Sequence, residues 1–406
     1  MPHTRTPSRH LTHTGILAVS VLALSACGSG GDEGSGDGEG GGGGTITIGA
    51  TGPQSGGAAL YGENVEAGLQ LAIDELNEQG VTVDGEEYTV ELSALDDEYQ
   101  PNAAATNAQR LAEQDSAAVV FIPHAGGIHA AQEINTGRSE FIVGAYTSER
   151  RVVEEGNELT FMIPPPFTSY SAPFIEQFRD QGAETLGLLA TSSEYGQQWT
   201  AMVTEDWEAA GGEVLSSNNF DYGAVSDFAS SVATALADDP DVILVGGPSQ
   251  TTALVIEEAR DQGYEGGFMI MDQAKFEEME LFTDPENLNN SVGQNPVLEY
   301  DDPGTDGLVD SFAENISEDR PVTAETSLNF QAVALVVKAM EIAGTTDDPA
   351  AIRAAMPEAV DEVDDAFRVS GFPEDVTDEG RLFSTDVEGA YRDSDGEYET
   401  FPLDVE

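Results

Sequence analysis

The sequence predicts an α/β protein built from two doubly wound parallel-sheet lobes. Short β-rich runs alternate with amphipathic helical runs from Thr45 onward. The alternation stops at a proline-rich break, Pro164-Pro165-Pro166, and then begins again. Repeated βα alternation predicts a parallel sheet with helices on both faces. Because proline continues neither a helix nor a central strand, the break marks a connection between two units of similar size.

The first unit begins with a short strand at Thr45 and continues into a helix. Apolar residues between Val65 and Leu76 recur near the 3.6-residue spacing of one helical face. The same reading extends along the rest of this unit. We expect strands at 45–49, 88–95, 117–122 and 141–143, and helices at 62–79, 102–114 and 128–134.

The second unit repeats the pattern and is followed by a helical segment with few strands. We expect strands at 185–190, 213–217, 242–245 and 268–271, and helices at 197–210, 226–237, 251–262, 307–316, 324–343 and 349–356. The last three helices complete a lobe begun earlier, because they bring too few strands for a third domain. From Ala366 the chain forms short β-rich pieces. The expected lobes are 45–165 plus 299–362 (N-terminal) and 166–298 plus 363–406 (C-terminal).

The first 26 residues have the pattern of a signal peptide. Arg5 and Arg9 precede an uncharged apolar run that spans residues 15–26. A helix needs about 20 apolar residues to cross a bilayer, so this run is too short for a permanent span. We expect residues 1–26 to be removed.

The apolar run ends in Leu24-Ser25-Ala26-Cys27, which resembles the lipobox of bacterial lipoproteins. The resemblance implies that Cys27, the only cysteine, receives a lipid and becomes the mature N-terminus. Residues 27–44 are then a lipid-anchored, glycine-rich linker, since their composition offers nothing to bury. We expect an extracytoplasmic protein held by lipid at the outer face of the cell membrane.

Composition excludes one class of partner and suggests a habitat. The chain has 76 acidic residues against 15 Lys and Arg, a net charge of −61. Nucleic-acid binding needs a basic face, so we expect none. The acidic residues are spread along the whole chain, which favours adaptation to high salt, where charges are screened over about 3 Å at 1 M. An acidic secreted protein without such adaptation is the alternative.

The motifs that would indicate an enzyme are missing from the sequence. There is no Gly-x-Ser-x-Gly elbow, His-Glu-x-x-His helix, Walker sequence or Cys-His arrangement. His124 and His129 lie five residues apart but lack a third ligand at fitting spacing, so we interpret them as loop and helix-face residues. We expect no catalysis, no metal and no cofactor.

A series of short motifs has a familiar order and spacing. They are Ile48-Gly49-Ala50-Thr51-Gly52-Pro53-Gln54-Ser55-Gly56, Tyr61-Gly62 before the helix from Gly68 to Asn77, Asp96-Asp97-Glu98, Tyr195-Gly196, Pro240-Asp241-Val242 and Gly246-Gly247. The series resembles the type I periplasmic binding proteins of the branched-chain amino acid (Leu/Ile/Val-binding) type, from Thr45 to the C-terminal region. The resemblance implies a clam-shell of two lobes joined by three crossover segments, with a small ligand in the cleft between them.

The resemblance also implies roles for single residues. Tyr61 and Tyr195 match aromatic contacts with the ligand, although either can simply pack beside the hinge. Thr147 matches a hydroxyl that holds the ligand's carboxylate together with backbone N–H groups; a helix N-cap is the alternative. Asp272 matches the acid that pairs with the ligand's amino group, and otherwise is a turn or surface acid.

Two loops depart from the family pattern. The loop after the third strand usually offers a serine for the carboxylate, but here it has Gly126 and Gly127, which supply only backbone groups. After the strand at 242–245, where many members place an aromatic residue, this chain has Pro248-Ser249-Gln250. We therefore expect an amino acid or amino-acid-like ligand, with amides, urea and aromatic acids as alternatives.

The family implies a role in transport. We expect a monomer that delivers its ligand to the permease of an ATP-binding-cassette (ABC) importer, whose separate ATPase subunits hydrolyse ATP. The membrane is contacted only through the lipid. A ligand-sensing receptor of the same fold is the alternative.

Overall fold

A computed structural model of the chain describes residues 43–137, 140–154, 157–222 and 228–405. The predicted signal peptide, the predicted lipid attachment at Cys27 and nearly all of the predicted linker lie outside these residues. Among the residues described, no helix combines the length and the apolar character that crossing a bilayer requires.

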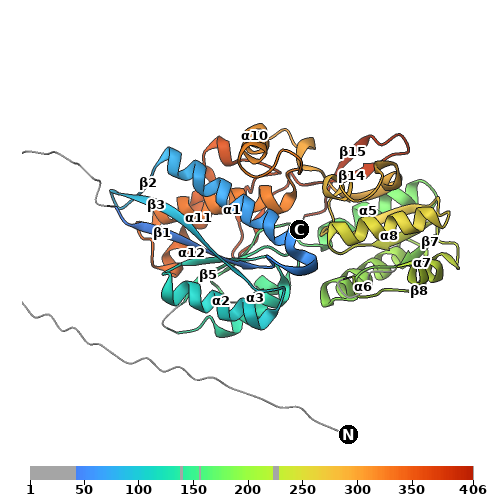
Figure 1. The fold of residues 1–406 in the computed structure, drawn as a ribbon, viewed down its shortest axis with the longest axis horizontal. Coiled ribbons are helices and arrows are strands. Elements are labelled where there is room, and N and C mark those ends of the chain that lie inside the picture. Colours follow the sequence, from blue (N-terminus) through green and yellow to red (C-terminus); the bar gives the residue numbers. More distant parts are fainter. Residues whose placement is uncertain (1–42, 138–139, 155–156, 223–227, 406) are drawn as a thin grey trace, which may run out of the picture. The chain divides into compact units, whose positions relative to one another are not determined.

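The first sheet has six strands in the order β2-β3-β1-β4-β5-β6 (Figure 1). Neighbouring strands are parallel except β2, which is antiparallel to β3. The strands are β1 (Thr45–Gly52), β2 (Val81–Val83), β3 (Glu86–Asp96), β4 (Val119–Ile122), β5 (Ile142–Ala145) and β6 (Thr160–Met162). All residues of β4 and β5 are buried, as expected for central strands covered on both faces.

Seven helices belong with this sheet. They are α1 (Ala59–Gln79), α2 (Pro101–Gln114), α3 (Ala125–Ile134), α4 (Arg151–Glu154), α10 (Thr305–Asn315), α11 (Ala324–Ala343) and α12 (Pro349–Ala359). Side chains alternate between the faces of a strand, so Phe121 packs in the core with α1 and α11, whereas Val120 packs in the core with α2 and α3. Figure 1 shows α1 and α11 on one side of the sheet and α2 and α3 on the other.

The second sheet has seven strands in the order β15-β14-β11-β10-β9-β7-β8. The strands are β7 (Thr185–Leu188), β8 (Glu213–Ser217), β9 (Val242–Val245), β10 (Gly267–Ile270), β11 (Ser291–Gln294), β14 (Glu388–Arg392) and β15 (Tyr398–Pro402). β7 to β11 run parallel, and β14 and β15 add an antiparallel edge.

Helices cover both faces of the second sheet as well. They are α5 (Thr168–Asp180), α6 (Glu194–Ala209), α7 (Ala229–Leu236), α8 (Ser249–Asp261) and α9 (Phe276–Met279). One core gathers α5 and α6 with Leu244 of β9, and the other gathers α7 and α8 with the neighbouring Ile243. Two doubly wound α/β sheets are therefore present, which confirms the predicted fold class.

Helices α1 and α11 approach each other closely beside the first sheet. A Cβ added at Gly68 would lie 2.2 Å from the backbone oxygen of Thr326, so only glycine fits at this crossing. Along α11 almost every residue is buried, which places several polar side chains of that helix inside the protein. One of them, Glu325, contributes to the site described below.

Most predicted elements are present within a few residues, and the long helix at 324–343 has the predicted limits. The structure adds β2, α4, β6, α5, α9 and β11, which the sequence analysis did not predict. Five of these elements have only three or four residues, too few for a periodic pattern to stand out. Helix α5 contains Pro173 in its interior, which disguised it.

The segment after α12 divides between the two sheets. Side chains of residues 363–382 pack in the core beside the first sheet, through Val363, Phe367, Val369, Phe372, Val376 and Leu382. The short hairpin of β12 (Asp375–Val376) and β13 (Leu382–Phe383) lies in this segment. Only β14 and β15 join the second sheet. The sequence analysis assigns all of 363–406 to the C-terminal lobe; on this packing we propose a boundary near residue 384 instead.

Candidate functional site

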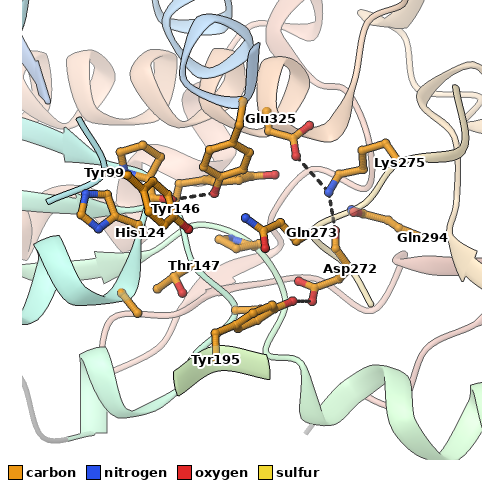
Figure 2. A pocket seen from close by; sticks show the side chains of 15 residues that line it. Tyr99, His124, Tyr146, Thr147, Tyr195, Asp272, Gln273, Lys275, Gln294 and Glu325 are labelled. Atoms are coloured by element: carbon orange, nitrogen blue, oxygen red, sulfur yellow. Dashed lines mark hydrogen bonds and ion pairs between the residues drawn. The ribbon is translucent and has the colours of Figure 1, made fainter. Parts of the chain in front are cut away.

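A cavity of about 490 Å³, including its mouth, lies where loops of both sheets converge. In each sheet the strand order reverses beside the first strand, β1 or β7, and ligands of open α/β sheets bind at such a point. The lining residues are Tyr61, Tyr99, Pro123, His124, Ala125, Tyr146, Thr147, Ser148, Pro164, Tyr195, Asp272, Gln273, Lys275, Gln294 and Glu325 (Figure 2).

Two tyrosines from the first sheet form an aromatic part of the wall. Tyr61 lies in the first turn of α1, and its hydroxyl donates a hydrogen bond to the carbonyl oxygen of Pro123 at 2.6 Å. Tyr146 follows β5, and the two ring centroids are 6.2 Å apart. Burial raises the pKa of both phenols well above the ordinary value. Both side chains are therefore neutral at physiological pH.

His124 is fixed by bonds at both ring nitrogens. Its Nδ1 accepts a hydrogen bond from the backbone N–H of Gly127 at 2.9 Å, which caps the N-terminus of α3. Its Nε2 lies 3.0 Å from Oδ2 of the buried Asp97. A nitrogen that accepts carries no proton, so the ring is the neutral tautomer with its proton on Nε2. Asp97 also accepts a hydrogen bond from the backbone N–H of Tyr99. The Tyr99 ring lies against the His124 ring, with the two ring centroids 4.7 Å apart.

Asp272 stands at the end of β10 and is held by two aromatic residues of α6. Its Oδ1 accepts hydrogen bonds from the Tyr195 hydroxyl and from Trp199 Nε1, the latter at 3.0 Å. Burial raises the pKa of Asp272, while the nearby Lys275 ammonium and hydrogen bonds from Tyr195, Ser148 and Trp199 act in the opposite direction. Burial outweighs these groups, so the pKa of this side chain, which is only 8% exposed, lies above its ordinary value.

An ion pair connects the second sheet to α11 at the edge of the cavity. Lys275 Nζ lies 3.0 Å from Glu325 Oε1 and also donates to the carbonyl oxygen of Asp272. Both charged side chains are at most 3% exposed. A second connection is close by, where Asn64 of α1 donates to Glu278 of α9 at 2.6 Å. Elements from both sheets therefore meet around the cavity.

The structure brings four of the predicted ligand contacts together. Tyr61, Thr147, Tyr195 and Asp272 all line the cavity. Gly126 and Gly127 do not, and the N–H of Gly127 is already bonded to His124. Asp272 is buried, which disfavours the alternative of a surface acid. A role of these residues in binding stays a prediction.

Other lining residues were not singled out from the sequence. They are Tyr99, Tyr146, Ser148, Gln273, Lys275, Gln294 and Glu325. Tyr146 and Ser148 flank the predicted Thr147, and Lys275 is one of only two lysines in the chain, so these three carried a signal. Glu325 carried none, because its position depends on how α11 packs. Figure 2 shows the Gln273 side chain among the other lining groups, between Tyr146 and Asp272.

The two histidines of the described chain contact different carboxylates. His124 bonds to Asp97, and His129 lies 3.4 Å from Glu149. Over the ranges that the structure describes, no group of three or more His, Cys, Asp or Glu side chains is arranged to hold a metal ion.

Comparison with known sequences identifies the family. The model of the periplasmic binding protein family matches residues 45–388. The Leu/Ile/Val-binding protein homolog 8 of Brucella abortus is 24% identical over 231 residues, 54% of this chain and 56% of that protein. Homolog 7 of Brucella melitensis is 25% identical over 232 residues, with the same coverage. The chain thus matches about half the length of these curated relatives.

Solved structures agree on the fold. The leucine-binding protein LivK of Thermotoga maritima has a TM-score of 0.71 at 19% identity, covering 88% of this chain and 98% of that one. The substrate-binding periplasmic protein of Ralstonia solanacearum has a TM-score of 0.76 at 19% identity, covering 88% and 100%. LivJ of Streptococcus pneumoniae, solved in complex with isoleucine, has a TM-score of 0.70 at 18% identity, covering 88% and 99%. Because the family model covers most of the chain, this protein belongs to the periplasmic binding protein family.

Proposed function

We propose that this chain is an extracytoplasmic solute-binding lipoprotein that captures a small amine-bearing molecule, an amino acid or a related compound, and delivers it to an ABC importer. One observation carries the proposal. Loops of both sheets line one cavity, with the carboxyl group of Asp272 and the ring of Tyr195 from the second sheet, and Tyr61 and Thr147 from the first.

The mechanism follows from the origin of these side chains. A ligand that contacts loops of both sheets interacts most strongly when the two groups of loops are close together, so it favours that arrangement by its differential affinity. The lobes act as a clam-shell, and the ligand-bound form is the one that the permease recognises. The ion pair Lys275–Glu325 and the hydrogen bond from Asn64 to Glu278 also join elements of the two lobes, so they too stabilise the closed arrangement.

The ligand class rests on the chemistry of the cavity. A carboxylate such as Asp272 forms a strong charge-assisted hydrogen bond with an ammonium group. Aromatic rings bury the apolar part of a small ligand and attract a cation at their faces. The solved relatives named for leucine or bound to isoleucine support an amine-bearing ligand.

Lipid attachment and transport rest on the sequence and on the family. The apolar run before Cys27 supports export and lipidation, and the glycine-rich residues after it allow the folded part to move while the anchor stays in place. Cys27→Ala is expected to release the protein from the membrane fraction; retention at the membrane would contradict the predicted anchor.

A thermal-shift screen at high salt tests the proposal directly. Amino acids, short amides, amines, urea and aromatic acids are added one at a time to the purified protein. A ligand that binds the folded state raises the melting temperature by mass action, by an amount that increases with its concentration over Kd. If no small molecule of these classes raises the melting temperature, the proposed function fails.

A further inference from the structure

Three charged side chains line the cavity: Asp272, Lys275 and Glu325. The other titratable groups there are His124, whose hydrogen bonds fix the neutral ring, and tyrosines that remain neutral phenols. Two carboxyl groups therefore face one ammonium group. A cationic ligand favours the ionised form of Asp272, and the described lining then has an excess of one negative charge opposite it.

Lys275 is already occupied by protein partners. Its ammonium pairs with Glu325 Oε1 at 3.0 Å and donates to the carbonyl oxygen of Asp272. Both members of the ion pair are almost fully buried, so water does not weaken it as it weakens a surface pair. A carboxylate on the ligand would have to compete with Glu325 for this lysine.

Besides Lys275, the side chains that line the cavity offer an anion only neutral donors, from Thr147, Ser148, Gln273 and Gln294. Among the described residues that line it, Lys275 is the only one with a cationic side chain. The N–H of Gly127, one of the two glycines expected to contact the ligand, donates instead to His124. Glu325 adds a further acceptor, because its Oε2 is buried without a hydrogen-bond partner within the described chain.

Groups that favour a cation are plentiful by comparison. Four tyrosine rings, from Tyr61, Tyr99, Tyr146 and Tyr195, line the cavity beside the carboxylate of Asp272. Aromatic faces attract a cation through their quadrupole, most strongly where water is excluded. The arrangement suits a ligand with one positive charge and no negative charge to oppose it.

We propose that the ligand has a net positive charge, as an amine whose carboxyl group is absent or masked as an amide or ester, and that Glu325 sets this preference by neutralising Lys275. The inference rests on the proposed function and narrows it from amino acids in general to their uncharged-carboxyl derivatives and simple amines.

The test compares matched pairs of probes on the unaltered protein. Each of the common amino acids and its α-amide is screened by thermal shift, and Kd is measured for every pair in which either member binds. We expect the amide of the best pair to bind at least tenfold tighter than the free amino acid. If free amino acids bind as tightly as their amides or tighter, the inference is wrong while the proposed function stands. If neither series binds, nor any simple amine, both fail.

Glu325→Gln then tests the residue itself. The substitution removes the charge that occupies Lys275, so the free ammonium becomes available to a ligand carboxylate. We expect the preference for amide over acid to fall at least tenfold. If the folded variant kept the parent's ratio of amide to acid affinity, Glu325 would not set the preference. If the variant does not fold, the comparison on the parent protein still decides the charge of the ligand.

The chain offers a matched control for this substitution. Its only other lysine, Lys338, pairs with Glu341 of the same helix at 2.5 Å, away from the cavity. Glu341→Gln removes an equivalent carboxylate from a lysine pair on α11. We expect this control to leave the ratio of amide to acid affinity within twofold of the parent.

Discussion

The substitution of Asp272 separates a binding role from a structural one. Asp272 Oδ1 accepts hydrogen bonds from the Trp199 indole N–H at 3.0 Å and from the Tyr195 hydroxyl. Asp272→Asn keeps an acceptor at Oδ1 but removes the negative charge. Asp272→Ala removes both the acceptor and the charge. The two variants therefore differ in what they do to the apoprotein, and they share the loss of charge toward a ligand.

The structure gives the expected magnitudes. Trp199 is fully buried, so in Asp272→Ala its N–H loses its acceptor and cannot reach water, at a cost of about 1–3 kcal/mol in the free energy of unfolding. Tyr195 lines the cavity, and its hydroxyl can turn toward solvent there. In Asp272→Asn both donors keep a partner, so we expect a loss below ~1 kcal/mol. Neutralising the partner of a buried ammonium costs ~2–5 kcal/mol in ligand affinity, which is roughly 30- to 4000-fold in Kd.

Two measurements distinguish these effects. Urea unfolding of the ligand-free protein gives the stability, and calorimetric titration with the tightest amine found by thermal shift gives Kd. Asp241→Asn is a suitable control, because the Asp241 carboxylate accepts hydrogen bonds from the backbone N–H groups of Glu184 and Thr185, and does not line the cavity. We expect this control to lose stability and keep its affinity.

The reasoning would be refuted by a single result. If Asp272→Asn bound the amine within twofold of the parent protein, the carboxylate could not be the ligand's charge partner. Asp272 would then be only a structural acceptor for Tyr195 and Trp199.

Three further predictions test the packing and the electrostatics. Gly68→Ala places a Cβ 2.2 Å from the Thr326 backbone oxygen, so we expect the free energy of unfolding to fall by ~1–3 kcal/mol. The control Gly307→Ala meets nothing within 4 Å and should not destabilise the protein. Equal melting temperatures for the two variants would contradict the close crossing of α1 and α11. The hydrogen bond that His129 donates to the Glu149 carboxylate raises the pKa of His129. Burial alone would raise the pKa of Glu149, but the hydrogen bonds that it accepts from His129, Gln198 and Arg151 outweigh burial and lower that pKa. A raised histidine pKa stabilises the fold below about pH 6.5, and a lowered glutamate pKa stabilises it above about pH 4.3. His129→Gln should therefore lower the free energy of unfolding by ~0.5–1 kcal/mol near pH 5.5 and leave it unchanged near pH 8.5. A loss of stability independent of pH would show that the pair is not ionic. The net charge of −61 predicts a melting temperature that rises from dilute to molar salt, and a melting temperature indifferent to salt would remove the case for high-salt adaptation.

Local pattern explains why most of the fold was predictable. Buried parallel strands read as continuous apolar runs, such as residues 242–245, and long helices show their period over several turns, as at 324–343. Three- and four-residue elements such as β6 and α9 have no room for a period, and they owe their conformation to the neighbours that they pair with or pack against. The residues 363–382 illustrate the same limit, since their apolar side chains fit either core by composition alone.

The site divides along the same line. The sequence by itself determined that two βα units follow one another and that basic side chains are scarce. It also placed Tyr61, Thr147, Tyr195 and Asp272 after the carboxyl ends of predicted strands. Only the tertiary structure decided that Glu325, 50 residues after Lys275, pairs with that lysine, and that His124 accepts the hydrogen bond from the N–H of Gly127. The physical reason is that periodicity and composition act over a few residues, whereas the charge of a cavity is set by side chains that packing brings together from distant parts of the chain.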